Sequence, residues 1–388
     1  MRPIDLSPTG ATPPRTEHTA VGACAPRWTR WATPAALAWS VATVAWAATW
    51  ALGLLPHPFA DPEQVALGAV LNAYHPAVGI GTVLAIGGLG TVTALVFLRR
   101  PAGSSARLGA VAVAWILAAV LALVMVHGRL LSLLGYALVV PVLGWFDPGL
   151  FGDFLRAAAA PDTFFVVGST VGALLWGAVA LTRHRARSQA CVACGRPHGW
   201  DHDDDTERRG RARRVGRIAV GIAVVMALGY PAVRLPWLFG IPAGLDAQTW
   251  AELQASGGDR AGIGLGLAAV TGALLMTGLI SRWGERFPRW MVGLAGRRVP
   301  ISLAVGPAAI VALALVATGR GTLPAIIAGA SRIPGSWLQT APFLALIPWG
   351  IALAVATAAY VVRRRGSCPT CGVGEEPAGE SHRCPRHG

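Results

Sequence analysis

Residues Leu108–Val126 read LGAVAVAWILAAVLALVMV, a stretch without a single charged side chain. A helix needs about 20 mostly apolar residues to cross a bilayer, and in lipid its backbone polar groups must be satisfied within the helix. The stretch therefore predicts a transmembrane helix. Seven other stretches are similarly apolar, with Arg234 near one edge as their single charged residue: Trp31–Leu55, Ala77–Leu98, Thr163–Thr182, Ile218–Leu238, Gly262–Ile280, Ile301–Thr318 and Ala341–Val362.

The composition of the whole chain agrees with a lipid environment. Of 388 residues, 54% are hydrophobic and only 13% are charged, whereas soluble proteins carry roughly 25% charged residues. None of the 19 acidic residues lies within the eight stretches, because a charge at mid-depth in a bilayer costs several kcal/mol. We expect an all-α polytopic membrane protein with the lipid bilayer as its main partner.

Arginine predicts the orientation of the chain. Lysine is absent, so all 33 basic residues are Arg; with eight spans and a cytoplasmic N-terminus, six lie outside and 27 (33 − 6) inside. The positive-inside rule then predicts a multi-pass plasma-membrane protein with both termini in the cytoplasm. The net charge of +14 reflects this orientation, with anionic lipid headgroups at the Arg clusters, and gives no ground for nucleic-acid binding.

A ninth apolar stretch, Leu130–Phe146, is shorter and is interrupted by Gly135, Pro141 and Gly144. Counted as a span, it would reverse all later segments and place the Arg-rich loop Arg183–Arg217 outside. We therefore interpret it as a re-entrant or interfacial segment on the outer side.

The two halves of the chain end alike. Arg183–Gly195 reads RHRARSQACVACG and Arg363–Gly372 reads RRRGSCPTCG, and each follows the fourth span of its half. This recurrence favours two parallel four-span repeats, although the hydropathy of any eight-span chain can be divided in two. The expected segments are a disordered cytoplasmic tail (1–26), the first repeat (27–182), a cytoplasmic loop with a Cys knuckle (183–217), the second repeat (218–362) and a zinc-ribbon-like tail (363–388).

The C-terminal knuckle has the ligand spacing of a zinc site. Cys368, Cys371, Cys384 and His387 form the pattern C-x2-C-x12-C-x2-H. Structural Zn²⁺ takes four N or S ligands in a tetrahedron, and cytoplasmic thiols stay reduced. The tail therefore predicts a structural zinc ion, against the alternative of a disordered tail with incidental Cys and His.

The loop knuckle leaves two interpretations open. Cys191, Cys194, His198 and His202 form C-x2-C-x3-H-x3-H, which has four ligands but cramped spacing for a separate site. Alternatively, Cys191 and Cys194 share one four-sulfur site with the C-terminal pair and join the repeats. A redox Cys pair is the competing chemistry, but none of these cysteines lies within a span or on the predicted outer side.

The acidic stretch Asp201–Glu207 (DHDDDTE) stands directly before the Arg cluster Arg208–Arg217. Juxtamembrane Arg clusters attract anionic headgroups. We interpret the pair as a solvated loop that anchors the topology.

Two functions are compatible with these patterns. The first is a non-enzymatic membrane protein whose zinc knuckles tie the repeats together or dock a cytoplasmic partner; the chain contains no recognisable catalytic set. The second is a transporter, permease-like or lipid-handling protein with a site between the repeats near the outer face. Its expected ligand vestibule consists of Arg129, Arg320, Arg234 and His75.

The loop Arg282–Pro300 reads RWGERFPRWMVGLAGRRVP. Together with Gly240–Leu245, this string resembles a group of multi-span integral membrane proteins of actinobacterial type, mainly over the second half of the chain. The resemblance implies a membrane fold and no particular activity.

Overall fold

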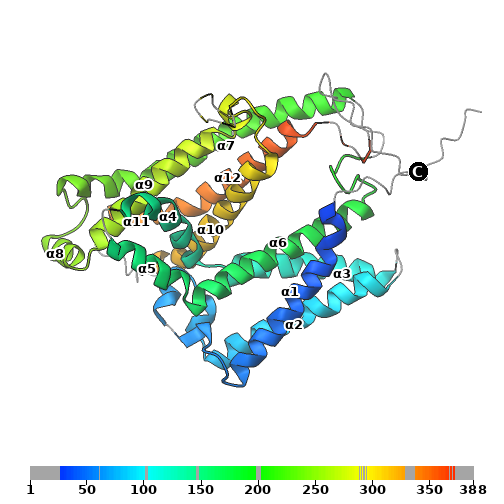
Figure 1. Cartoon of the computed structure of the whole chain (residues 1–388), viewed down its shortest axis with the longest axis horizontal. Coiled ribbons are helices and arrows are strands. Elements are labelled where there is room, and N and C mark those ends of the chain that lie inside the picture. The colour runs from blue at the N-terminus through cyan, green and yellow to red at the C-terminus, as the bar shows by residue number, and fades with distance from the viewer. Residues whose placement is uncertain are drawn as a thin grey trace, which may run out of the picture.

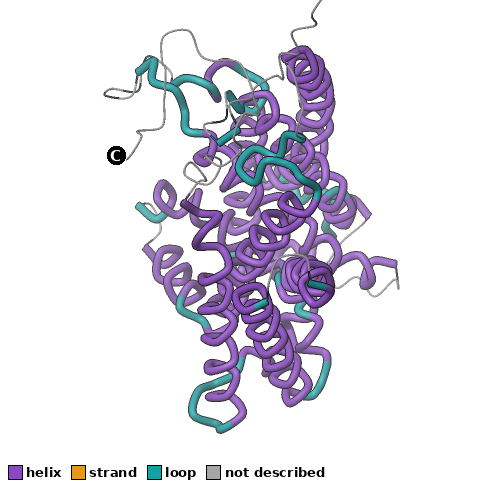
Figure 2. Tube along the Cα trace, turned by 90° about the vertical axis from the view of Figure 1, so that its right-hand side faces the viewer, coloured by secondary structure: helices purple, strands orange, loops and turns teal. Residues whose placement is uncertain are grey.

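The computed structural model describes residues 27–60, 62–100, 104–145, 148–197, 202–287, 289, 291, 293, 295–327, 337–366, 368 and 370–371. In this part of the chain the secondary structure is helical, with two isolated β-bridges and no strand (Figure 2). The expected all-α class is thus confirmed for the described residues.

The first half of the chain forms a bundle of four long helices, which we call the first bundle: α1 (Arg27–Ala51), α2 (Pro76–Arg99), α3 (Ser105–Val120) and α6 (Pro161–Arg187). Their buried side chains, among them Ala36, Phe97, Leu117 and Trp176, make up one apolar core. The connecting helices are η2 (Pro58–Ala60), η3 (Pro62–Leu67), η4 (Val70–Ala73), the π-helix η5 (Leu121–Met125), α4 (Gly128–Leu143) and α5 (Pro148–Ala158).

The second half forms another four-helix bundle, the second bundle: α7 (His202–Arg234), α9 (Gly258–Thr277), α10 (Ile301–Ile327) and α12 (Leu346–Arg364). A separate core contains Ala223, Met276, Leu315 and Tyr360. In Figure 1 this bundle lies above the first, with α4 and α5 between them near one end. The connecting helices are η6 (Leu235–Phe239), α8 (Ala247–Ala255), η7 (Arg282–Gly284) and α11 (Trp337–Leu344).

Seven helices in the described part are long and apolar enough to cross a membrane. They match seven of the eight expected spans. The eighth, α1, packs against α2 and α6 but is not among the seven. Its sequence holds five tryptophans, and because each indole carries a polar N–H, a tryptophan makes a helix less apolar than an aliphatic residue does.

The stretch Leu130–Phe146 is less irregular than its glycines and proline suggest. Residues Gly128–Leu143 form the continuous helix α4, which has 16 residues and is shorter than a span. It packs against α9 and α10 of the second bundle. Gly135 permits this approach, because a Cβ there would lie 2.6 Å from Leu265 Cδ2. The helix therefore joins the two bundles.

Two expected boundaries differ from the structure. Helix α10 continues to Ile327, beyond Thr318, where we expected the span to end. Helix α7 begins at His202, well before the expected span start at Ile218. The acidic stretch and the Arg cluster are therefore largely helical rather than a loop, since spacings of four residues pair Asp205 with Arg209 and Glu207 with Arg211.

Candidate metal centre

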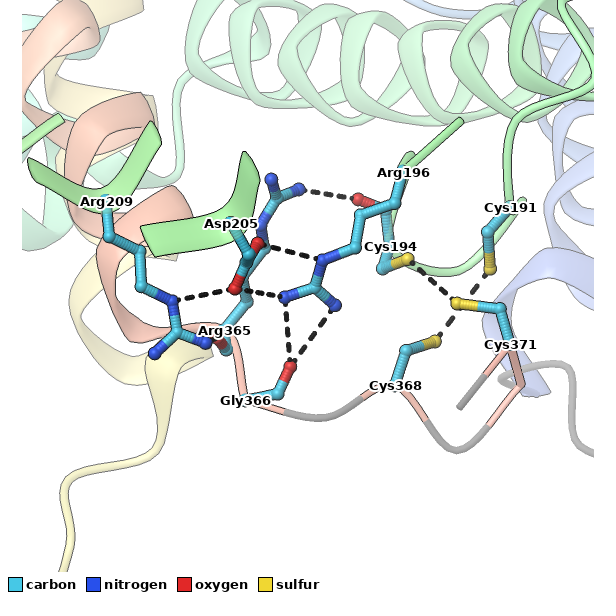
Figure 3. Close-up of polar contacts among 9 residues, drawn as sticks. All are labelled: Cys191, Cys194, Arg196, Asp205, Arg209, Arg365, Gly366, Cys368 and Cys371. Carbon is cyan, nitrogen blue, oxygen red and sulfur yellow. Dashed lines mark hydrogen bonds and ion pairs between the residues drawn. The ribbon is translucent and has the colours of Figure 1, made fainter. Parts of the chain in front are cut away.

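The four cysteines of the two knuckles lie together. The loop after α6 carries Cys191 and Cys194, and the segment after α12 carries Cys368 and Cys371 (Figure 3). Their four sulfur atoms all lie within 4.8 Å of one another. The structure therefore brings together two motifs that are 177 residues apart in the chain.

The sulfur spacing fits a tetrahedral ion. The Sγ atoms of Cys191 and Cys368 are 3.8 Å apart, and those of Cys194 and Cys371 are 3.6 Å apart. Four sulfurs at the usual Zn–S distance of about 2.3 Å form a tetrahedron with edges of about 3.8 Å. All four cysteines are free thiols, so the cluster can hold a metal ion without breaking a disulfide.

The loop knuckle is held in shape by its backbone. Cys191 N–H donates to Arg196 O at 2.9 Å, and Gly195 N–H donates to Cys191 O at 2.7 Å. Gly195 has a φ of +73°, and a Cβ there would lie 3.0 Å from the Arg185 guanidinium. The turn therefore requires glycine, for its backbone conformation and for the space that Arg185 occupies.

The C-terminal knuckle stabilises a thiolate. Burial alone disfavours the charged Cys368, but backbone N–H groups of Cys371 and Thr370 donate to its sulfur, and the net effect lowers its pKa to about 7. Burial raises the pKa of Cys194. Cys368 is buried and Cys371 is exposed, so the cluster lies at the surface with one ligand open to solvent.

A buried ion pair supports the cluster from behind. The Arg196 guanidinium donates to both carboxylate oxygens of Asp205 at 3.1 Å, and it also donates to Gly366 O (Figure 3). Burial opposes the charge of Arg196, but Asp205 and the neighbouring Cys194 raise the pKa of the guanidinium. Arg196 and Asp205 are 1% and 3% exposed. The prediction that Asp205 belongs to a solvated loop was therefore wrong.

Arginines also connect α7 and α12 to the cluster. Arg365 donates to Cys194 O at 2.8 Å, and Arg209 donates to Arg365 O at 2.9 Å. Four thiolates around Zn²⁺ carry a formal charge of minus two, which nearby guanidinium groups offset. No sequence pattern predicts this support, because the acidic run and the Arg run have the composition of ordinary solvated segments.

The other predicted zinc ligands are not placed. His198, Cys384 and His387 lie outside the described residues, and of His202 only the backbone is described, at the start of α7. The two separate zinc sites therefore stay predictions, while the four-sulfur arrangement has all its ligands in one place.

One of the expected vestibule residues belongs to a buried ionic cluster. Arg129, near the start of α4, lies 3.7 Å from Asp162 Oδ2 and donates to the Thr163 hydroxyl at 3.2 Å. His127 is 2% exposed, and its Nε2 lies 3.1 Å from Asp162 Oδ1. Asp162 therefore offsets the positive charge of Arg129, which we expected to face a ligand.

The other three vestibule residues have different surroundings. Arg320 donates to Gly68 O at 3.0 Å, which links α10 of the second bundle to the segment between η3 and η4. The Arg234 guanidinium lies over the Trp237 ring, 4.3 Å from its centroid. His75 caps α2 by accepting from Ala77 N–H. Their joint role as a vestibule stays a prediction.

Comparisons with known proteins add no assignment. No protein-family model matches the chain, and no curated protein or solved structure resembles it significantly. The architecture and the four-cysteine cluster are therefore the grounds on which a function can be proposed.

Proposed function

We propose that this chain is a non-enzymatic integral membrane protein in which one zinc ion, bound by Cys191, Cys194, Cys368 and Cys371, joins its two halves. The observation that carries the proposal is the convergence of the four sulfur atoms within 4.8 Å. Zinc fits because four cysteine ligands in a closed tetrahedron are typical of structural zinc sites. The expected location is the cytoplasmic face of the plasma membrane, where thiols stay reduced.

The proposed role follows from which segments the cysteines occupy. One pair follows the last helix of the first bundle, and the other follows the last helix of the second bundle. If the two bundles are repeats, each repeat contributes half of the site. A zinc ion at this site would connect the two bundles at one end. Helix α4 and the Arg320–Gly68 contact join the bundles elsewhere. The exposed Cys371 side of the cluster is also where a cytoplasmic partner would dock.

Zinc stoichiometry tests the shared site. We expect one zinc per purified chain, lost when any of the four cysteines is replaced by Ser. The zinc should be retained in Cys384→Ser, His387→Ala and His198→Ala. Cys24→Ser, in the N-terminal segment 1–26, is the control for the loss of a thiol that is not a ligand. Two zinc ions per chain would favour separate sites. No bound metal would contradict the zinc proposal altogether.

A second function, transport or lipid handling near the outer face, has one observation in its favour. His127, Arg129 and Asp162 place ionisable groups where Val126, Leu130 and Val166 pack against Ala314 and Ala317 of the second bundle. Ionisable groups buried in membrane proteins are costly and are often functional. Replacement of Arg129 or Arg320 by Gln should then alter ligand binding or flux at unchanged expression; indifference to both would count against this function.

A further inference from the structure

The first bundle contains an apolar cavity of about 230 Å³, away from the metal centre. Its floor consists of buried side chains from α2 and the π-helix η5, and its walls are aromatic side chains of α1 and α6. The floor residues are Val83, Ile86, Leu121 and Met125, and the aromatic wall residues are Trp39, Trp46, Trp50, Phe164 and Phe165.

Two polar groups in these walls have partners within the protein. Trp39 Nε1–H donates to Gly168 O at 3.0 Å, and the Thr43 hydroxyl donates to Trp39 O at 2.9 Å. The cavity thus presents almost only carbon. An apolar cavity of this kind favours apolar molecules over water, so hydrocarbon is the chemical class that fits it.

The rim of the cavity is exposed and apolar. Trp46 on α1 is 43% exposed, and Phe164 and Val171 on α6 are 51% and 45% exposed. Helix α6 is long and apolar enough to span a membrane, as are α2 and the continuous helix of α3 and η5. Because α6 forms one side of the rim and α1 packs against α2 and α6, we expect the rim to open on the hydrocarbon of the bilayer that surrounds these helices.

Two local features maintain the open space. Helix α3 ends in the π-turn Leu121–Met125, which supplies two floor residues, and π-turns within helices are frequent at functional sites. Gly172 accommodates the Trp39 ring, since a Cβ there would lie 2.2 Å from Trp39 Cζ2. By contrast, a Cβ at Gly168 would meet no atom within 4 Å, so this second glycine borders empty space.

We propose that the cavity binds one acyl chain of a membrane glycerophospholipid. Its volume is below the roughly 300–1,000 Å³ of sites that enclose whole small molecules, so it accommodates a chain segment while the rest of the lipid stays in the bilayer. Glycerophospholipid is the hydrocarbon source that a bilayer presents at the rim. The proposal depends on the membrane setting and is independent of the zinc ion.

A photoreactive lipid tests the proposal directly. The full-length protein is reconstituted in nanodiscs containing phosphatidylglycerol with a diazirine in one acyl chain, irradiated and mapped by peptide mass spectrometry. Met125 and Leu121 are only 3% and 2% exposed, so we expect label there only if a chain enters the cavity. Val225 on α7 is 64% exposed, so label on this residue measures contact with lipid at the surface of the protein.

Filling the cavity provides the matched comparison. Gly168→Leu should reduce label at Met125 at least fivefold and leave label at Val225 unchanged. Gly177→Leu is the control on the same helix, since a Cβ there also meets no atom within 4 Å and the residue does not line the cavity. Ala42→Phe blocks the rim from α1 and replaces Gly168→Leu if that variant fails to fold. Label confined to exposed residues, or equal label at Met125 in the folded blocking variants, would overturn the proposal.

Discussion

The Sγ atoms of Cys194 and Cys371 lie 3.6 Å apart, although 177 residues separate these two cysteines in the chain. Cys191 and Cys368 have the same separation in sequence and lie 3.8 Å apart. Each knuckle thus contributes one member to each close pair. A metal ion at this position would link the end of the first bundle to the end of the second, which neither knuckle could do alone.

Loss of the metal should free the C-terminal segment. In Cys371→Ser we expect trypsin to cleave after Arg365 at least tenfold faster, because the Arg365 contact with Cys194 O depends on the two knuckles being held together. The measurement is a time course of limited proteolysis in detergent, with Cys24→Ser as the control. Equal cleavage rates in both variants would show that the metal does not hold this segment.

Zinc retention should depend on pH, with weaker binding in acid. Metal ligation requires thiolates, so protons compete with zinc. With its pKa lowered to about 7, Cys368 is mostly thiolate above pH 7 and becomes protonated as the pH falls through that value. Chelator competition at pH 8, 7 and 6 should show the affinity falling by at least about tenfold per pH unit. An affinity that is the same at all three values would contradict thiolate ligation.

The buried ion pair behind the cluster should tune metal affinity. Asp205→Asn leaves Arg196 buried without its counter-charge, and breaking one partner of such a pair costs about 3–5 kcal/mol. We expect zinc affinity to fall by roughly 10–100-fold, the usual effect of losing a group that orients metal ligands. Asp204→Asn, at the exposed neighbouring position, should bind zinc like the unaltered protein. Equal affinities in the two variants would mean that the ion pair does not position the knuckle.

Close backbone packing should hold the bundles together at the opposite junction. A Cβ on Gly321 of α10 would lie 2.2 Å from Gly68 Cα, and overpacking of this kind typically costs about 1–3 kcal/mol. Gly321→Ala should therefore lower the thermal unfolding midpoint. Gly306→Ala, on the same helix with no atom within 4 Å of its Cβ, should leave the midpoint unchanged or raise it. A midpoint that does not fall in Gly321→Ala would indicate that this contact opens at little cost.

Local sequence was sufficient to predict most of the spans, because the requirement that a membrane imposes on the chain is met within each helix. Backbone groups in lipid must be satisfied within their own helix, so apolar length alone predicts where Ser105–Met125 and most other long helices lie. The same reasoning was weaker at helix ends outside the lipid. There, pairing of Asp205 with Arg196 and Arg209 stabilises the start of α7, and hydropathy contains no information about such pairs.

By itself, the sequence determined the helical membrane class, most of the spans and the presence of two Cys-x-x-Cys knuckles. Only the tertiary structure decided that Cys191 and Cys194 lie against Cys368 and Cys371, and that α4 docks onto the other bundle. The physical reason is the separation in sequence between the residues that interact. Helix formation and knuckle turns depend on neighbours a few residues away, whereas the four-sulfur cluster depends on how two bundles pack, and that packing is specified by contacts spread over the whole chain.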